Sequence, residues 1–192
     1  VVLAALGQPA GPGDPLAAID GAVLVAPAVW GRATMNPLYR TTLWLGAHTM
    51  PWLRVTGRGL DILPSDNIEM LRALGRDPLV IKETRIDALY GLVNLMDTAL
   101  AASAQVEMPL LILFGALDEV IPKVPTRRMI GGLSGPRRFA LYDAGYHMLL
   151  RDLQAETVWR DVLAWAQDPT APLPSGAEAD GGDVFLKGGP ER

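Results

Sequence analysis

Three short apolar runs divide the chain and predict strands that are buried on both faces. They are residues 21–27 (GAVLVAP), 110–114 (LLILF) and, more weakly, 138–142 (RFALY). None alternates apolar and polar positions, and such continuous runs are typical of parallel sheets covered by helices on both sides. Helical patterns follow the second and third runs, over residues 125–133 and 155–167. This order predicts the α/β class: a mainly parallel sheet with flanking helices and right-handed crossovers.

A longer stretch with helical spacing, residues 30–104, separates the first two runs. Asp66 with Glu69, and Thr84 with Asp87, have the spacing of a capping box. The apolar residues behind Thr84 recur at helical spacing and predict an amphipathic helix. The sequence therefore predicts a helical region inserted between two strands of the sheet.

The two ends of the chain differ in character. Residues 1–6 are apolar and stop at Gly7, which predicts the last turns of a buried helix with a glycine cap. From Asp168 onward the chain is rich in Pro, Gly, Ala and acidic residues, and large apolar side chains are few. Such a composition buries little surface, so residues 168–192 are expected to form a flexible tail.

Composition narrows the classes of function. The 192 residues include no cysteine, which excludes a disulfide framework, a thiolate zinc site and a cysteine nucleophile. The two histidines, His48 and His147, match no metal motif, and the formal net charge of −4 argues against a nucleic-acid-binding face. No apolar run reaches the roughly 18 residues of a membrane span. We expect no metal or organic cofactor, no nucleic-acid partner and a cytoplasmic location, with any export signal upstream of Val1.

Two polar residues lie where a parallel sheet places its chemistry. Asp118 follows the run at 110–114 by a few residues, and His147 follows the run at 138–142, beyond Gly145. Open α/β sheets place their ligand-binding and catalytic groups outside the carboxyl ends of the strands. Either residue alone would more often be structural, as a turn-capping aspartate or a histidine without a role. Together they predict a carboxylate–imidazole pair in which the aspartate holds the imidazole in one tautomer.

Two segments carry a resemblance to a known superfamily. Residues 109–122 (PLLILFGALDEVIP) and 142–149 (YDAGYHML) resemble the acid and histidine loops of α/β-hydrolases, most closely the monoacylglycerol lipase and lysophospholipase branch. Residues 21–30 (GAVLVAPAVW) resemble the strand before the lid of that branch. The resemblance implies a partial α/β-hydrolase fold, with a core of residues 1–29 and 105–167 and a helical lid at 30–104. It also implies the triad order Ser…Asp…His, with Asp118 as the acid and His147 as the base.

The serine of such a triad is not among these residues. The nucleophile elbow G-x-S-x-G is absent, and the nearest string, GLSGP at 132–136, ends in proline and lies between the acid and the histidine. We therefore expect the C-terminal part of a serine carboxylic-ester hydrolase, which supplies Asp118 and His147 and has the missing N-terminal half as its partner. The chain alone should be inactive, and the unpaired edge of the strand at 21–27 should promote self-association.

The lid is where the resemblance places the substrate, a small lipid-like ester. The lid region is rich in aromatic residues and methionine, which also implies transient contact with a membrane surface. The same side chains would serve equally to pack the lid onto the sheet, and His48 is expected to be a lid histidine without a catalytic role. Two alternatives stay open: a catalytically inactive binding module, and another chemistry of the same fold, such as epoxide hydrolysis or dehalogenation. The candidate substrate contacts are Trp30, Trp44, Leu45, Met50 and Trp52.

Overall fold

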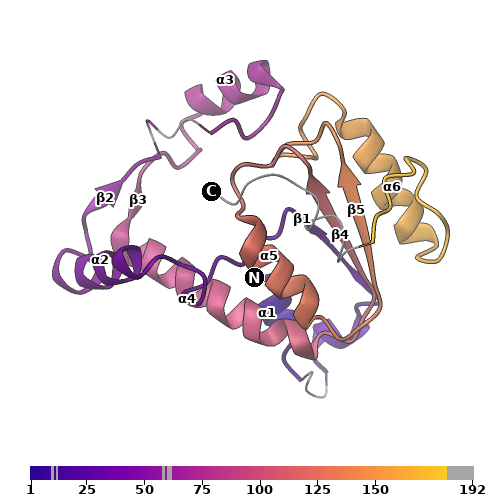
Figure 1. Cartoon of the computed structure of the whole chain (residues 1–192), viewed down its shortest axis with the longest axis horizontal. Coiled ribbons are helices and arrows are strands. Elements are labelled where there is room, and N and C mark those ends of the chain that lie inside the picture. Colours follow the sequence, from indigo (N-terminus) through magenta and orange to yellow (C-terminus); the bar gives the residue numbers. More distant parts are fainter. Residues whose placement is uncertain (10, 12, 58, 60–61, 181–192) are drawn as a thin grey trace.

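A computed structural model describes residues 1–180 of the chain, apart from residues 10, 12, 58, 60 and 61. At its centre lies a parallel sheet of three strands in the order β1-β4-β5 (Figure 1). The strands are β1 (Ala22–Val25), β4 (Leu110–Gly115) and β5 (Arg137–Tyr142). The three strands expected from the apolar runs are confirmed, and so is the α/β class, because helices connect and flank parallel strands.

The central strand β4 is buried along its whole length, which explains why its sequence is apolar at every position. Successive side chains point to opposite faces of a strand. On one face, Ile112 belongs to a cluster that includes side chains from α1 (Val2–Leu6) and α5 (Lys123–Gly132). On the other face, Leu111 packs with residues of α6 (Ala155–Gln167). The sheet is therefore covered by helices on both sides.

Helices make up much of the region between β1 and β4. It contains α2 (Pro37–Thr49), α3 (Ile68–Arg76) and α4 (Ile86–Ala102), followed by the short 3₁₀ helix η2 (Ser103–Gln105). Another 3₁₀ helix, η1 (Pro15–Ala18), precedes β1. The two-residue strands β2 (Arg54–Val55) and β3 (Thr84–Arg85) form a small antiparallel sheet. The long helix α4 packs on α1 at one end and on α2 at the other, so it joins this region, which we call the lid, to the core.

Two local expectations about helix starts were wrong, and one about a helix end was confirmed. The α3 helix is capped by Asn67, whose side chain accepts a hydrogen bond from the N–H of Met70 at 3.1 Å, and not by Asp66. The α4 helix begins only at Ile86, because Thr84 pairs in β3. The expected glycine cap is confirmed, because Gly7 ends α1, with an ordinary φ of −86°. Its need for glycine is steric: a Cβ there would lie 2.3 Å from the carbonyl oxygen of Ala102.

The expectation of a flexible tail is wrong for residues 168–180, which we call the C-terminal segment. Its backbone pairs with the outer edge of β5: the N–H of Leu141 donates to Ala177 O at 2.9 Å, and the N–H of Ala179 donates to Phe139 O at 3.0 Å. Leu173 is only 3 % exposed and belongs to the core. The remaining residues of the expected tail, 181–192, lie outside the described residues.

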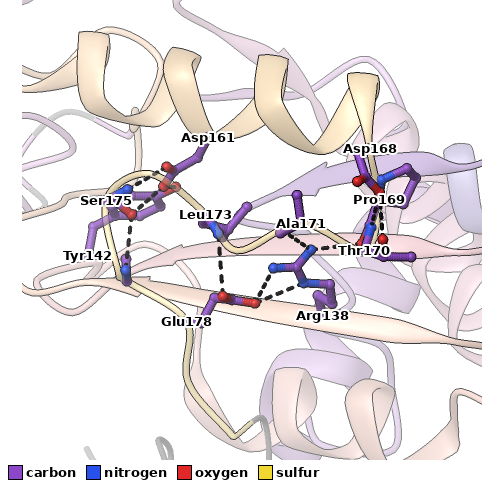
Figure 2. A network of polar contacts seen from close by, with 11 residues as sticks. Arg138, Tyr142, Asp161, Asp168, Pro169, Thr170, Ala171, Leu173, Ser175 and Glu178 are labelled. Carbon is purple, nitrogen blue, oxygen red and sulfur yellow. Dashed lines mark hydrogen bonds and ion pairs between the residues drawn. The ribbon is translucent and has the colours of Figure 1, made fainter.

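Polar side chains hold the C-terminal segment in place (Figure 2). The guanidinium of Arg138 donates to the carbonyl oxygens of Pro169 and Ala171 and forms an ion pair with Glu178. Composition alone did not predict this order, because backbone pairing and a few polar contacts supply what the segment lacks in apolar surface.

Candidate active site

Asp118 and His147 lie at the carboxyl ends of the neighbouring strands β4 and β5. The Nδ1 atom of His147 and the Oδ2 atom of Asp118 are 3.0 Å apart, within hydrogen-bond distance. The Asp118 side chain is 3 % exposed and that of His147 is 29 % exposed. The structure thus brings together the two residues that the sequence placed after successive strands.

The carboxylate of Asp118 is held in one orientation. Its Oδ1 atom accepts hydrogen bonds from the backbone N–H groups of Val120 at 2.8 Å and Ile121 at 3.1 Å. Oδ2 is then directed at the imidazole. The sequence-based alternative for Asp118, a cap of the following turn, is therefore also true: one oxygen caps the turn and the other contacts His147.

Two glycines let the loops after β4 and β5 approach one another. A Cβ on Gly115 would lie 2.3 Å from the carbonyl oxygen of Gly145, and a Cβ on Gly145 would lie 3.1 Å from the Cα atom of Gly115. Backbone hydrogen bonds then join the loops, since the N–H of Leu117 donates to Gly145 O at 2.9 Å. The short distance between Asp118 and His147 therefore depends on Gly115 at the end of β4 and on Gly145 in the loop after β5.

This arrangement suits an imidazole that moves protons. When the ring proton is on Nδ1, that N–H donates a hydrogen bond to the buried carboxylate, and the lone pair of Nε2 is left to accept a proton from a second partner. The carboxylate also stabilises the ring once Nε2 has been protonated. The described residues contain no cluster of three or more potential metal ligands, and none of their helices is long and apolar enough to cross a membrane.

The lid residues named as candidate substrate contacts fall into two groups. Trp44 and Leu45 lie on α2, and Met50 and Trp52 in the turn after it. Each is about half exposed or more, from 48 % for Met50 to 66 % for Trp52. Trp30 lies apart from them, partly buried in the loop that follows β1. Trp30 thus follows the carboxyl end of β1, whereas the other four lie on or just after α2.

His48 is held within the lid. Its ring stacks on Trp44 with 4.5 Å between centroids and meets Tyr90 edge-on at 5.5 Å. Its Nδ1 atom lies 2.7 Å from the carbonyl oxygen of Trp44, one helical turn earlier. These ring contacts and this hydrogen bond give His48 a structural role within the lid.

A family model described as serine aminopeptidase, S33, matches residues 4–154. The chain belongs to this family of α/β-hydrolases. The match runs from α1 to the loop before α6 and includes both Asp118 and His147.

Solved structures of lipolytic enzymes share the fold of this S33-family chain. A monoacylglycerol lipase from Paleococcus ferrophilus has a TM-score of 0.69 at 22 % identity, and the match covers 85 % of this chain and 62 % of the lipase. A soluble variant of monoglyceride lipase from Saccharomyces cerevisiae, in complex with a substrate analogue, has a TM-score of 0.68 at 18 % identity, covering 88 % and 61 %. A structure reported with LipS and LipT, two metagenome-derived lipolytic enzymes, has a TM-score of 0.61 at 20 % identity, covering 86 % and 59 %. The S33-family chain thus spans about three fifths of the length of each of these proteins.

Sequence reasoning missed two buried polar residues beside His147. Ser65, in the lid, is fully buried, and Asp152, just after the histidine loop, is 3 % exposed. Their side chains are hydrogen-bonded to each other at 2.6 Å. The only sequence signal was the position of Asp152, five residues after the candidate histidine. That signal does not predict burial, because aspartates are usually exposed.

Proposed function

We propose that this chain is the acid- and base-bearing part of a serine carboxylic-ester hydrolase that acts on lipid-like monoesters. The observation that carries the proposal is the 3.0 Å contact between Nδ1 of His147 and Oδ2 of Asp118, at the ends of adjacent parallel strands. Membership of the S33 family supports serine-hydrolase chemistry, and the lipases among the structural neighbours favour an ester as the substrate.

In this proposal His147 is the general base and then the general acid. A serine supplied by residues outside this sequence attacks the ester carbonyl, while Nε2 of His147 takes its proton. The bond to the leaving alcohol breaks as His147 protonates that oxygen, and an acyl-enzyme remains. Water repeats the cycle: His147 takes its proton and passes it to the departing serine oxygen. Asp118 stabilises the imidazolium in both halves.

The apolar surface of the lid supports a lipid-like substrate. Trp44, Leu45, Met50 and Trp52 expose large areas on and beside α2, and an acyl chain would cover such surface. Trp30 is the candidate to contact the ester end of the substrate, because it follows the carboxyl end of β1, and Asp118 and His147 follow the carboxyl ends of the parallel strands β4 and β5. Transient contact of the same lid surface with a membrane is part of the proposal.

The acid and base roles are tested in the full-length protein. His147→Ala should remove hydrolysis of p-nitrophenyl esters, while the melting temperature stays near that of the unmodified protein. His48→Ala is the matched control, because it removes the chain's other histidine and should leave kcat unchanged. Ester hydrolysis that survives His147→Ala would overturn the proposed mechanism.

The source of the nucleophile is tested separately with the 192-residue chain. No serine in it lies in an elbow sequence, so a fluorophosphonate probe should leave the chain unlabelled. Covalent labelling of this chain, together with ester turnover above a heat-treated sample, would disprove the assignment of the serine to other residues.

A further inference from the structure

Both backbone N–H groups that flank His147 are hydrogen-bonded to defined acceptors. The N–H of Tyr146 donates to Oδ2 of Asp152 at 2.8 Å. The N–H of Met148 donates to the carbonyl oxygen of Pro64 at 3.0 Å. Pro64 belongs to the lid, so one of the two anchors of the histidine backbone comes directly from that region.

The other anchor also leads to the lid. Asp152 is 3 % exposed, and its second oxygen, Oδ1, accepts a hydrogen bond from the hydroxyl of Ser65 at 2.6 Å. Ser65 is fully buried and its hydroxyl also accepts the N–H of Asn67 at 3.2 Å. A buried carboxylate is costly unless its oxygens are hydrogen-bonded. Asp152 meets this condition by linking the lid with the amide before His147.

Two further hydrogen bonds join the same two segments. The N–H of Leu153 donates to Oδ1 of Asp66 at 2.9 Å, and the side-chain amide of Asn67 donates to Arg151 O at 3.0 Å. We call these contacts between residues 64–67 and 146–153 the lid latch. No helix or strand covers residues 143–154, so the conformation of the histidine loop depends on such contacts.

We propose that the lid latch is a positioning device for His147, in which Ser65 and Asp152 hold the histidine backbone so that Nδ1 stays directed at Asp118. The placement of the imidazole is then coupled to the docking of the lid at residues 64–67. This inference rests on the proposed function only for the catalytic role of His147, because the coupling itself is a property of the fold. Misplacement by about 1 Å can cost on the order of 100-fold in rate, so loss of this support should be measurable.

The test observes the imidazole of His147 directly in the full-length protein. With ¹⁵N-labelled histidine, the Nδ1–H signal that His147 gives while bonded to Asp118 is identified by its loss in Asp118→Ala. Its exchange with solvent is then compared among variants. Asp152→Leu and the milder Ser65→Ala should accelerate exchange by about tenfold, as expected for the loss of roughly one net hydrogen bond. Asp152→Asn should stay within about threefold, because its amide can accept from Tyr146 and donate to Ser65.

Asp161→Leu is the matched control for general loss of stability. Asp161 is fully buried and bonded to the Tyr142 hydroxyl at 2.7 Å, so its removal should lower the melting temperature without changing exchange at His147. Unchanged exchange in Ser65→Ala and Asp152→Leu, or equal acceleration in Asp161→Leu, would overturn the proposal. Should Asp152→Leu fail to fold, Ser65→Ala decides the matter alone. The signal does not depend on ester hydrolysis, so failure here and failure of the proposed function are distinguishable.

Discussion

Asp118→Asn is the substitution for which the structure makes the sharpest prediction. In the native chain, Oδ1 of Asp118 accepts two backbone N–H groups and Oδ2 faces Nδ1 of His147. The asparagine oxygen should take the Oδ1 position, because an amide NH₂ there would face two N–H donors. The NH₂ group would then face Nδ1, which must accept, and the ring proton moves to Nε2. A ring protonated at Nε2 cannot take the proton of a serine.

The magnitude follows from the cost of the opposite orientation. Flipping the amide would leave two donors unsatisfied, at about 1–3 kcal/mol each, so at least about 2 kcal/mol in total. The productive orientation would then be populated in roughly 3 % of molecules or fewer. We expect kcat to fall at least about 30-fold, and by up to about 10⁴-fold, the loss that this tautomer error causes in serine proteases.

The assay is hydrolysis of a p-nitrophenyl ester by the full-length protein, with kcat and KM measured separately. Because the error affects proton transfer and not binding, kcat should fall while KM changes little. Asp161→Asn is the matched control, since it also alters a buried, hydrogen-bonded carboxylate and should leave kcat unchanged. If Asp118→Asn kept more than about a tenth of the activity, Asp118 would not be setting the tautomer of His147.

Three further predictions concern stability. Gly115→Ala should lower the free energy of unfolding by about 3 kcal/mol, because its Cβ would lie 2.3 Å from a backbone oxygen; a change below about 0.5 kcal/mol in denaturant melts would contradict this. Leu173→Ala should lower the free energy of unfolding in denaturant melts by about 2–5 kcal/mol, because Leu173 is buried. If the C-terminal segment were flexible, the same substitution would change this free energy by nearly zero. Burial, together with the neighbouring Asp161, raises the pKa of Tyr142. Because this pKa is raised in the folded state, the protonated Tyr142 hydroxyl stabilises the fold fully below the unfolded tyrosine pKa of about 10, and this stabilisation is lost as the pH rises above it. Thermal stability should therefore fall more steeply above pH 10 in the native chain than in Tyr142→Phe, and equal slopes would refute the assignment.

The sheet and the acid–base pair could be predicted because their signals are local. The apolar run around Ile112 has no polar position, and this pattern has few interpretations other than a strand buried on both faces. Once β4 and β5 are parallel neighbours, their carboxyl ends lie together, and residues a few positions beyond them, such as Asp118 and His147, can meet. Gly115 at the end of β4 and Gly145 in the loop after β5 were visible in the sequence, although the steric reason for glycine there required coordinates.

The features that sequence reasoning missed depend on contacts between distant residues. Asp152 and Ser65 are 87 positions apart, and neither stands in a pattern that predicts burial. The C-terminal segment was misjudged for the same reason: Leu173 is one leucine in a polar context, and its burial depends on backbone pairing with β5. Local capping rules erred where a neighbouring asparagine or a strand pairing competed, as at Asn67 and Thr84.

The two outer edges of the sheet differ in whether another segment pairs with them, and this difference can be tested. The C-terminal segment covers the edge of β5, whereas β1 ends the sheet on its side in the described part of the chain. The N–H groups of Ala22 and Ala26 donate inward to the β4 side, so alternation directs the N–H of Val23 outward.

An open apolar edge can template pairing with another copy. The 192-residue chain should therefore self-associate in analytical ultracentrifugation. Val23→Pro should reduce association, because it removes an outward donor without removing a bond to β4. Leu24→Pro is the contrasting control, because the N–H of Leu24 faces β4 and its loss should disrupt the pairing of β1 with β4. A monodisperse native chain would mean that this edge is protected in some other way, and the edge argument would fail.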